Sequence, residues 1–177
     1  MVDKPGCELL EKRVFVFDLD LTLWSHEDAQ SLKPPIRVEG LRAIDSTGDV
    51  AELYECVPRL FKLLKERGKK IAIASWNAPQ TPTELLRLFG LWQYIDYAII
   101  EPHPYKTSML MRIMTRLAAT PEEVVFFDDN EEIAERVASN LGLDVYVVGR
   151  DIDHICELER ILEKSAECTA SGAQPRP

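Results

Sequence analysis

The chain has 177 residues, which is near the usual size of a single domain, and nothing along it requires a second hydrophobic core. Hydrophobic residues make up 46% of the chain and charged residues 29%, a globular composition that excludes long disorder and collagen-like repeats. The net charge of −9 repels nucleic acids and anionic membranes, and no basic patch offsets it, so we expect neither as a partner.

The N-terminus and the cysteines indicate the compartment. The first residues hold no apolar run of signal-peptide length, and no later run approaches the roughly 18 apolar residues of a membrane span. The four cysteines form no C-x-x-C pair and the histidines are scattered, so neither zinc-ligand spacing nor a disulfide framework is visible. These cysteines are Cys7, Cys56, Cys156 and Cys168. We expect a cytoplasmic protein whose thiols are reduced and mostly structural.

The first third of the chain contains one strand and one irregular stretch. Residues 1–12 form an N-terminal segment for which we predict no element, and an apolar run at residues 13–18 predicts the first strand. Residues 24–54 then break the pattern with a Pro-Pro pair, a glycine and a Ser-Thr-Gly-Asp turn. We expect a β-hairpin flap there rather than a helix.

Helices and strands alternate over the rest of the chain. The predicted helices cover residues 57–67, 81–90, 130–142 and 153–164, and the predicted strands cover residues 70–75, 97–100, 124–128 and 145–148. A Thr-Pro-Thr-Glu capping box at Thr81, Asn130 and Asp153 mark helix starts. The strands are rich in Val, Ile and Phe without alternation, as strands buried on both faces are. The expected fold class is α/β, a Rossmann-like doubly wound parallel sheet in one domain over residues 13–165, with a disordered tail at residues 166–177.

The residues that end the strands carry the candidate chemistry, because ligands of an open α/β sheet bind outside the carboxyl ends of its strands. Along the chain these residues are Asp18, Asp20 and Thr22, then Ser75, Trp76 and Asn77, then Lys106, and last Asp128 and Asp129. Four carboxylates brought together repel one another unless a cation lies between them, and oxygen ligands in this number suit Mg²⁺. The sequence therefore predicts a Mg²⁺ site at this edge of the sheet.

Such a site has every group that phosphoryl transfer requires. A carboxylate beside Mg²⁺ stays ionised and can attack phosphorus, which gives an aspartyl phosphate. A second carboxyl group can protonate the leaving oxygen and later activate water. Lys106 and the Ser75 hydroxyl can hold the transferring phosphoryl oxygens.

The order of these residues resembles a known family. Asp-Leu-Asp-Leu-Thr at residues 18–22, then Ser75, Lys106 and the Asp128-Asp129 pair, resemble the four motifs of the haloacid dehalogenase (HAD) superfamily of phosphohydrolases. The longer strings around the first and last motifs, VFDLDLTLW and VFFDDN, resemble its magnesium-dependent phosphatase branch, which is acid phosphatase-like and capless. The similarity covers roughly residues 13–150, and its specificity comes from the order of the motifs.

The resemblance implies roles for the four acidic residues. It makes Asp18 the nucleophile and Asp20 the general acid and base. Asp18, Asp20 and Asp128 are the implied metal ligands, with Asp20 contributing its backbone carbonyl. Asp129 is either a further ligand through water or an orienting group.

The resemblance also implies roles for the residues around them. Ser75 and Lys106 are expected to hold the phosphate, Trp76 and Asn77 to contact the substrate, and Thr22 to brace the loop. Neither the flap nor the interval from Ser75 to Lys106 is long enough for the cap domain that many members of the superfamily carry. The implied substrates of such an open site are phosphotyrosine-like aryl phosphates or sugar phosphates, on a small molecule or a phosphoprotein. The sequence does not choose between them or indicate an oligomeric state.

Two other functions fit parts of the pattern. A phospho-receiver signalling domain also combines an Asp acyl phosphate, Mg²⁺, a hydroxyl and a Lys, but its acidic pair follows the first strand and its acceptor the third. A related phosphoryl- or acyl-transfer domain that acts on a carrier protein shares the Asp-Leu-Asp-x-Thr-Leu-Trp opening. Such domains usually sit within longer chains.

Overall fold

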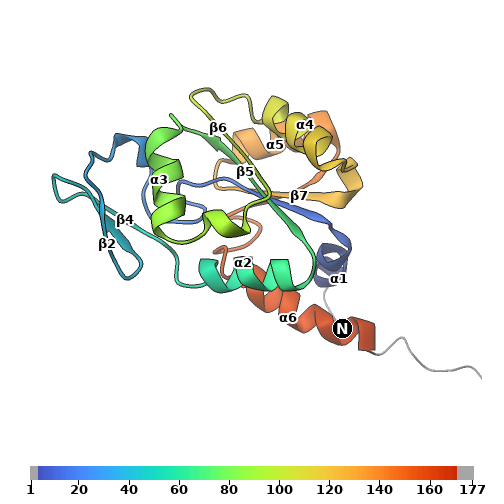
Figure 1. Cartoon of the computed structure of the whole chain (residues 1–177). Helices are drawn as coiled ribbons and strands as arrows, with labels where there is room; N and C mark the ends of the chain where they lie inside the picture. The colour runs from blue at the N-terminus through green and yellow to red at the C-terminus, as the bar shows by residue number, and fades with distance from the viewer. Residues whose placement is uncertain (1–3, 171–177) are drawn as a thin grey trace, which may run out of the picture.

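A computed structural model describes residues 4–170, and its centre is a five-stranded parallel sheet (Figure 1). The strands are β1 (Val14–Phe17), β5 (Lys70–Trp76), β6 (Tyr97–Glu101), β7 (Val124–Asp128) and β8 (Asp144–Val147). Their order is β6-β5-β1-β7-β8, and every neighbouring pair is parallel. The chain winds outward from β1 in both directions, so the carboxyl ends of β1 and β7 border the switch point at which such sheets bind ligands. The predicted fold class is confirmed.

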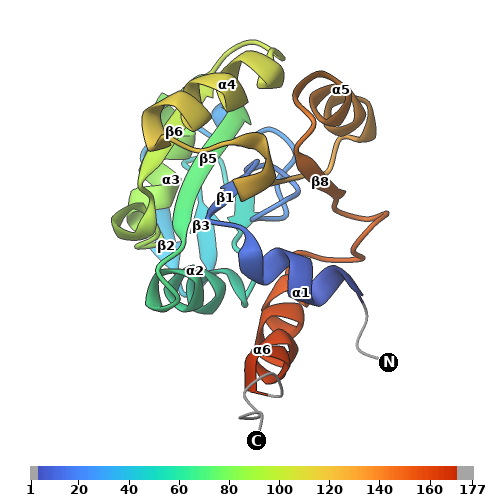
Figure 2. The ribbon, with the colours of Figure 1, turned by 90° about the vertical axis from the view of Figure 1, so that its right-hand side faces the viewer.

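Helices cover both faces of the sheet (Figure 2). They are α1 (Lys4–Glu11), α2 (Val57–Glu66), α3 (Gln80–Leu88), α4 (Lys106–Leu117), α5 (Glu131–Leu141) and α6 (Glu157–Ala170), with short 3-10 turns at Ala29–Ser31, Trp92–Tyr94 and Pro121–Glu123. Val14 and Val16 of β1 pack with α4 and α5, whereas Phe15 and Phe17 pack with α2, α3 and α6. Every residue of β1 is therefore buried, which explains the unbroken apolar run in its sequence.

The flap consists of three strands rather than the single hairpin that the sequence predicts. β2 (Arg37–Glu39), β3 (Arg42–Ile44) and β4 (Val50–Glu52) form an antiparallel sheet at the left of Figure 1. The expectation of a β-hairpin flap rather than a helix is confirmed, and Gly40, at a φ of +63°, makes a second tight turn between β2 and β3 that adds the third strand. The predicted turn joins β3 to β4, where an Asp45 oxygen accepts the backbone N–H groups of Thr47 and Asp49. Within residues 4–170 neither insertion point carries a cap domain, as expected.

Several predicted boundaries differ from those observed. Helix α1 lies in the segment for which the sequence predicts no element, and it packs against α6. Helix α3 begins at Gln80 without the predicted side-chain cap, because Thr81 is buried within its first turn. Helix α6 begins at Glu157 rather than at Asp153 and continues to Ala170, into the expected tail, whose residues 171–177 lie outside the described part. The cap at Asn130 is confirmed, since its Oδ1 accepts the Ile133 N–H at 3.1 Å.

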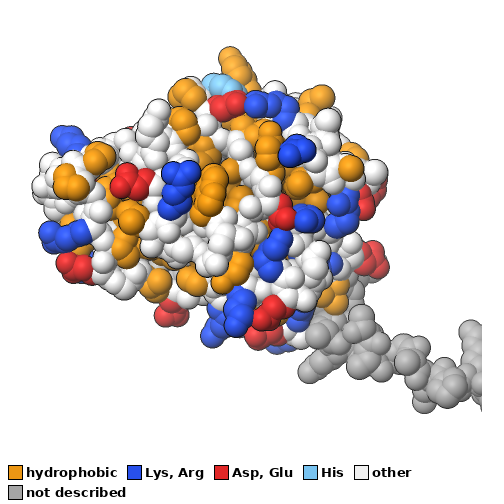
Figure 3. Space-filling model, in the orientation of Figure 1, with side chains coloured by type: hydrophobic (Ala, Val, Ile, Leu, Met, Phe, Trp, Pro, Cys, Tyr) orange, Lys and Arg blue, Asp and Glu red, His pale blue; other side chains and the backbone are white. Residues whose placement is uncertain are grey.

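Surface charge is mixed on the face shown in Figure 3. Basic and acidic side chains are interspersed there, with apolar side chains between them. The net charge of −9 is therefore not displayed as a continuous acidic surface on this face. Among residues 4–170, no helix combines the length and the apolar character that crossing a membrane requires.

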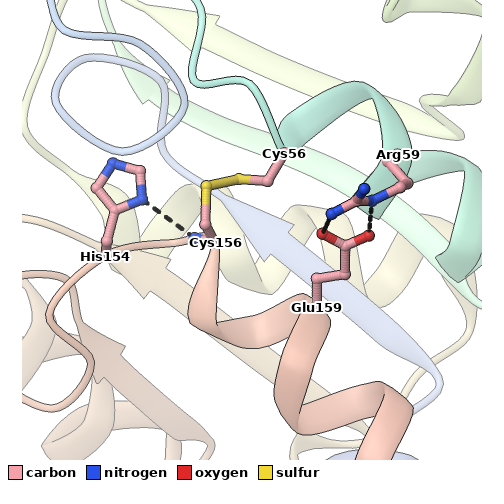
Figure 4. Close-up of a disulfide and its surroundings, with 5 residues drawn as sticks. All are labelled: Cys56, Arg59, His154, Cys156 and Glu159. Carbon is pink, nitrogen blue, oxygen red and sulfur yellow. Dashed lines mark hydrogen bonds and ion pairs between the residues drawn. A yellow bond between two sulfur atoms is a disulfide. The ribbon is translucent and has the colours of Figure 1, made fainter.

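A disulfide joins Cys56 to Cys156, so the expectation of reduced thiols is wrong for this pair (Figure 4). The two residues are 100 positions apart in the chain, and their Cα atoms lie 5.4 Å apart. Folding alone brings them together, and sequence spacing does not reveal such a pairing. Beside the bond, Arg59 of α2 makes a two-contact ion pair with Glu159 of α6. The side chains of the other two cysteines lie outside the described part of the chain.

Candidate active site

The loop after β1 gives its two carboxylates different partners. Asp18 is buried, and its Oδ1 accepts a hydrogen bond from Lys106 Nζ at 2.6 Å. Asp20 Oδ1 accepts from Trp24 Nε1 at 2.7 Å, and its Oδ2 accepts from Asn77 Nδ2 at 2.9 Å. One carboxylate is thus held by a cation and the other by neutral donors.

The environment of Asp20 favours its protonated form. Burial raises the pKa of Asp20, and the hydrogen bonds from Asn77 and Trp24 lower it. The negative charge of Asp18 raises it further, so the pKa of Asp20 lies above its ordinary value. The backbone N–H of Ala29 is also shared by both oxygens, at 3.3 and 3.2 Å. A carboxyl group with a raised pKa is a better candidate for the general acid than an ordinary Asp.

Lys106 joins the ends of three strands. It is the first residue of α4 and is buried, and its ammonium donates to Asp18 Oδ1 at 2.6 Å, Asp128 Oδ2 at 2.9 Å and Ala74 O at 2.7 Å. Burial disfavours the charge, but the two carboxylates outweigh burial and raise the pKa of Lys106. Because an ammonium has three protons, every donor of Lys106 has a partner.

Three carboxylates converge beside this lysine. Oxygens of Asp18, Asp128 and Asp129 lie within 4.8 Å of one another. Burial raises the pKa of Asp128 to about 7, with Lys106 opposing and Asp18 adding to the rise. Burial and then the charge of Asp18 raise the pKa of Asp129 to about 6. One ammonium does not balance three carboxylates, and this all-oxygen donor set fits Mg²⁺.

The cluster differs in one respect from the predicted ligand set. Asp18 and Asp128 belong to it, and Asp129, which the sequence leaves undecided, belongs to it as well. Among the described residues the carboxylate of Asp20 is not part of the cluster. A ligand role for Asp20 through its backbone carbonyl stays a prediction.

Ser75 and Thr22 lie behind the cluster rather than at its surface. Ser75, near the end of β5, is fully buried, and its Oγ accepts Asn77 Nδ2 at 3.0 Å. It therefore reaches Asp20 only through Asn77. Thr22 is fully buried too, and its hydroxyl has no hydrogen-bond partner within the described residues. Its backbone N–H donates to Leu19 O at 3.2 Å and closes the turn after β1.

A cavity of about 170 Å³ opens over these groups. Its lining residues are Asp18, Asp20, Leu21, Glu27, Trp76, Asn77, Lys106, Asp128, Asp129, Asn130 and Ile133. Trp76 is 50% exposed and provides an apolar wall. The sequence analysis misses Glu27 of the flap and Ile133 of α5 as lining residues. Neither belongs to a motif, and each is brought to the cavity only by the way its segment folds over the sheet.

Comparison with known proteins agrees with this geometry. Residues 11–164 match a family model described as acid phosphatase. The chain is also 31% identical over 107 residues to the pyrophosphatase PpaX of Halalkalibacterium halodurans, across 56% of this chain and 48% of that protein. The chain thus spans about half the length of this curated relative.

Solved structures with the same fold include three hydrolases or phosphatases. The N-terminal part of a Bacteroides fragilis protein, containing a phosphatase domain complexed with Mg, has a TM-score of 0.64 and 19% identity, covering 90% of this chain and 42% of that chain. A second structure is that of the 3-deoxy-D-manno-octulosonate 8-phosphate phosphatase of Moraxella catarrhalis in complex with magnesium and phosphate ions and KDO. Its TM-score is 0.57 at 13% identity, and the match covers 94% of this chain and 96% of that chain. A HAD-superfamily hydrolase of Geobacter sulfurreducens has a TM-score of 0.62 and 14% identity, and the match covers 86% of this chain and 97% of that chain.

Proposed function

Since the chain belongs to the acid phosphatase family, we propose that it is a Mg²⁺-dependent phosphomonoesterase that acts through an aspartyl-phosphate intermediate. The observation that carries this proposal is the contact of Lys106 Nζ with both Asp18 and Asp128, at 2.6 and 2.9 Å. It joins a carboxylate nucleophile to a group that can neutralise phosphate, at the sheet edge where ligands bind.

Asp18, Asp128 and Asp129 would hold the Mg²⁺ ion. When bound, the ion would neutralise the crowded carboxylates and the charge that develops on the transferring phosphoryl oxygens. The fit rests on oxygen donors alone and on the raised pKa values of Asp128 and Asp129, which reflect carboxylates that are buried with too little positive charge.

The two carboxyl groups of the loop after β1 have different roles, one as nucleophile and the other as general acid and base. Asp18 attacks phosphorus and forms the aspartyl phosphate, while Asp20, whose pKa is raised mainly by burial, gives its proton to the leaving oxygen. In the second step the ionised Asp20 takes a proton from water as that water attacks the aspartyl phosphate. Phosphate then leaves, Asp18 is free again, and Asp20 has regained its proton.

Other residues of the site hold the phosphoryl group. Lys106 can turn one of its N–H groups from Asp18 toward a phosphoryl oxygen, and Asn77 Nδ2 lies at the same edge. Ser75 acts through Asn77, to which its hydroxyl is hydrogen-bonded. Fixed donors of this kind stabilise charge that builds up in the transition state.

The rim of the cavity favours an aryl phosphate over a sugar phosphate. Trp76 and Leu21 line the cavity and are among the exposed large hydrophobic residues. An aromatic leaving group can stack on Trp76 and pack against Leu21, whereas these two side chains offer the several hydroxyl groups of a sugar one N–H donor and no acceptor. We therefore place phosphotyrosine-like aryl phosphates ahead of sugar phosphates as substrates, and the fit of the aryl group excludes water from an open site.

Hydrolysis of para-nitrophenyl phosphate tests the reaction class. The purified protein should hydrolyse it with Mg²⁺ and lose the activity with EDTA. A protein that takes up a phosphoryl group and keeps it without turnover would instead be a phospho-receiver domain.

A substrate panel tests the preference for aryl groups. Phosphotyrosine peptides should give a higher kcat/KM than sugar phosphates or phosphoserine peptides. Trp76→Ala should lower kcat/KM for the aryl substrates by about 2- to 10-fold and leave the sugar phosphates unchanged. Trp92→Ala is the matched control, because Trp92 is also partly exposed but does not line the cavity. Equal losses for all substrates would refute the stacking role of Trp76.

A further inference from the structure

The Cys56–Cys156 disulfide lies at the start of two helices (Figure 4). Cys56 directly precedes α2, and Cys156 directly precedes α6. The N-terminus of a helix stabilises a thiolate relative to a thiol, and the thiolate is the form that exchanges disulfides. Both cysteines therefore stand where exchange is favoured.

The two cysteines differ in their access to solvent. Cys56 is buried at 4% exposure, whereas Cys156 is partly exposed. An external thiol or disulfide can thus reach Cys156 first, with Cys56 as the resolving residue. A partly exposed cysteine beside a buried one suits a pair in which the exposed residue reacts first.

A short chain of contacts connects the disulfide to the catalytic loop. The ring of His154 lies 4.2 Å from that of Tyr54, measured between centroids, and its Nδ1 accepts the Cys156 N–H at 3.2 Å. The Tyr54 N–H donates to Leu23 O at 3.0 Å, one residue before the Trp24 that holds Asp20.

The phenol of Tyr54 is close enough to Asp129 to feel its charge. Burial and then the charge of Asp129 raise the pKa of Tyr54. On its other side, Tyr54 O accepts the N–H of Val57, the first residue of α2, at 3.0 Å. Tyr54 therefore contacts Val57 next to Cys56, the ring of His154 near Cys156, and Leu23 next to the Trp24 that donates to Asp20.

We propose that Cys56 and Cys156 form a reversible thiol–disulfide site that controls the neighbouring active site, with the disulfide form as the more active one. This inference rests on the proposed phosphatase function. In the disulfide form the catalytic contacts of Asp18, Asp20 and Lys106 are assembled. Opening the bond frees the Cys156 loop, and with it His154, from α2, so that Tyr54 loses one of its supports.

The redox partner is a low-molecular-weight disulfide of the glutathione type. Cys156 as a thiolate attacks it, forms a mixed disulfide and releases one external thiol. Cys56 then attacks the Cys156 sulfur and releases the second external thiol. Two cysteine thiols lose two electrons and two protons, and the external disulfide becomes two thiols.

A metal site is the rival explanation for these residues. Cys56, His154 and Cys156 also form a group in which ligand atoms of all three residues lie within 4.8 Å of one another. A structural zinc site takes four protein ligands, and this group within the described residues provides three, two of which are bonded to each other. The disulfide therefore describes the cluster better.

The exchange chemistry is tested by mass spectrometry in a Cys7→Ser/Cys168→Ser background, in which only the pair reacts. Oxidised glutathione should close the Cys56–Cys156 bond, and dithiothreitol should open it. Cys56→Ser should accumulate glutathione on Cys156, whereas Cys156→Ser should take up much less on the buried Cys56. Failure of the bond to close, or 1:1 binding of Zn²⁺ that blocks closure in the reduced protein, would overturn the proposal.

The coupling is tested on the same protein by kinetics and by the NMR resonances of His154 and Tyr54. Reduction should shift both resonances and lower kcat/KM for para-nitrophenyl phosphate by about fivefold or more. Cys56→Ser/Cys156→Ser should stay at the reduced level whatever the glutathione state. Equal kcat/KM in the two redox states would overturn the control of activity. If neither state hydrolyses the substrate while the resonances still shift, the coupling stands and the proposed reaction is wrong.

Discussion

Asp18 and Asp20 are two positions apart on one loop, and their surroundings separate their roles. Lys106 donates to Asp18, so a cation lies directly beside that side chain. Asp20 accepts only from neutral donors in buried surroundings, and its pKa is raised. Groups whose environments divide them in this way can serve as nucleophile and acid at a single pH.

Replacement of Lys106 by Met should destabilise the metal-free protein, because it removes the positive charge between two carboxylates. The variant leaves Asp18 and Asp128 buried without their shared cation, and removal of one partner from a buried ion pair typically costs about 3–5 kcal/mol. Urea unfolding without metal should show a loss of this size, and Mg²⁺ should restore more stability to the variant than to the wild type. Unchanged stability of the metal-free variant would contradict a structural charge balance by Lys106.

Replacement of Asn77 by Ala should move the alkaline limb of the pH–rate profile. The Asn77 hydrogen bond lowers the pKa of Asp20, so its loss raises this pKa and keeps the acid protonated to higher pH. The alkaline limb of kcat/KM, measured between about pH 5 and pH 9, should move to higher pH. Asn140→Ala, at an exposed position away from the catalytic cavity, should leave the profile unchanged. A limb that moves down in Asn77→Ala would refute Asp20 as the acid.

Sequence patterns identify the strand-end residues of the site well because their positions follow from strand periodicity and strand order. Asp18, Lys106 and Asp128 do meet at the sheet edge. The burial of Ser75 behind Asn77 and the contribution of Glu27 depend on side-chain rotamers and on the path of the flap. Neither is encoded in a local pattern.

Strands and central helices follow from the sequence, whereas contacts between distant segments do not. The apolar runs predict all five strands of the parallel sheet, because strands buried on both faces leave a strong local signal. The pairing of α1 with α6 and the bond between Cys56 and Cys156 join segments that are far apart in the chain. Their partners become evident only once the sheet is assembled.

The disulfide should stabilise the whole fold as well as hold the Cys156 loop. It links residues 100 positions apart, and bonds across loops of this length typically contribute about 2–5 kcal/mol. Urea unfolding should show a loss in this range when a reductant is added. The ion pair of Arg59 with Glu159 still joins α2 to α6, so the reduced protein should remain folded. Cys56→Ser/Cys156→Ser is the control, and a response of that variant to reductant would show that the bond is not the cause.

Three acidic residues of the site link the stability of the whole fold to pH. Asp128 is buried and Asp20 and Asp129 are partly buried, and all three have raised pKa values, so above about pH 4 the folded metal-free protein holds protons that the unfolded chain has released. Stability therefore falls as pH rises from the ordinary Asp pKa, near 4, to the folded values of about 6 for Asp129 and about 7 for Asp128.

Mg²⁺ should counteract the loss of stability with rising pH. Without Mg²⁺, the melting temperature should decrease between about pH 5 and pH 7.5, and Mg²⁺ should raise it more at the higher pH, where the carboxylates are ionised. Asp128→Asn should weaken both trends. A melting temperature that rises over this range without metal would contradict the raised pKa values.

Asp18 should carry the phosphoryl group during turnover. The Asp20→Asn variant lacks the base for the second step, so it should accumulate phosphoenzyme from para-nitrophenyl phosphate. Borohydride reduction of the acid-quenched variant, followed by peptide mass spectrometry, should find homoserine at position 18, and Asp18→Asn/Asp20→Asn should give none. Reduction at another residue, or no trapped product in a variant that still releases para-nitrophenol, would contradict Asp18 as the nucleophile.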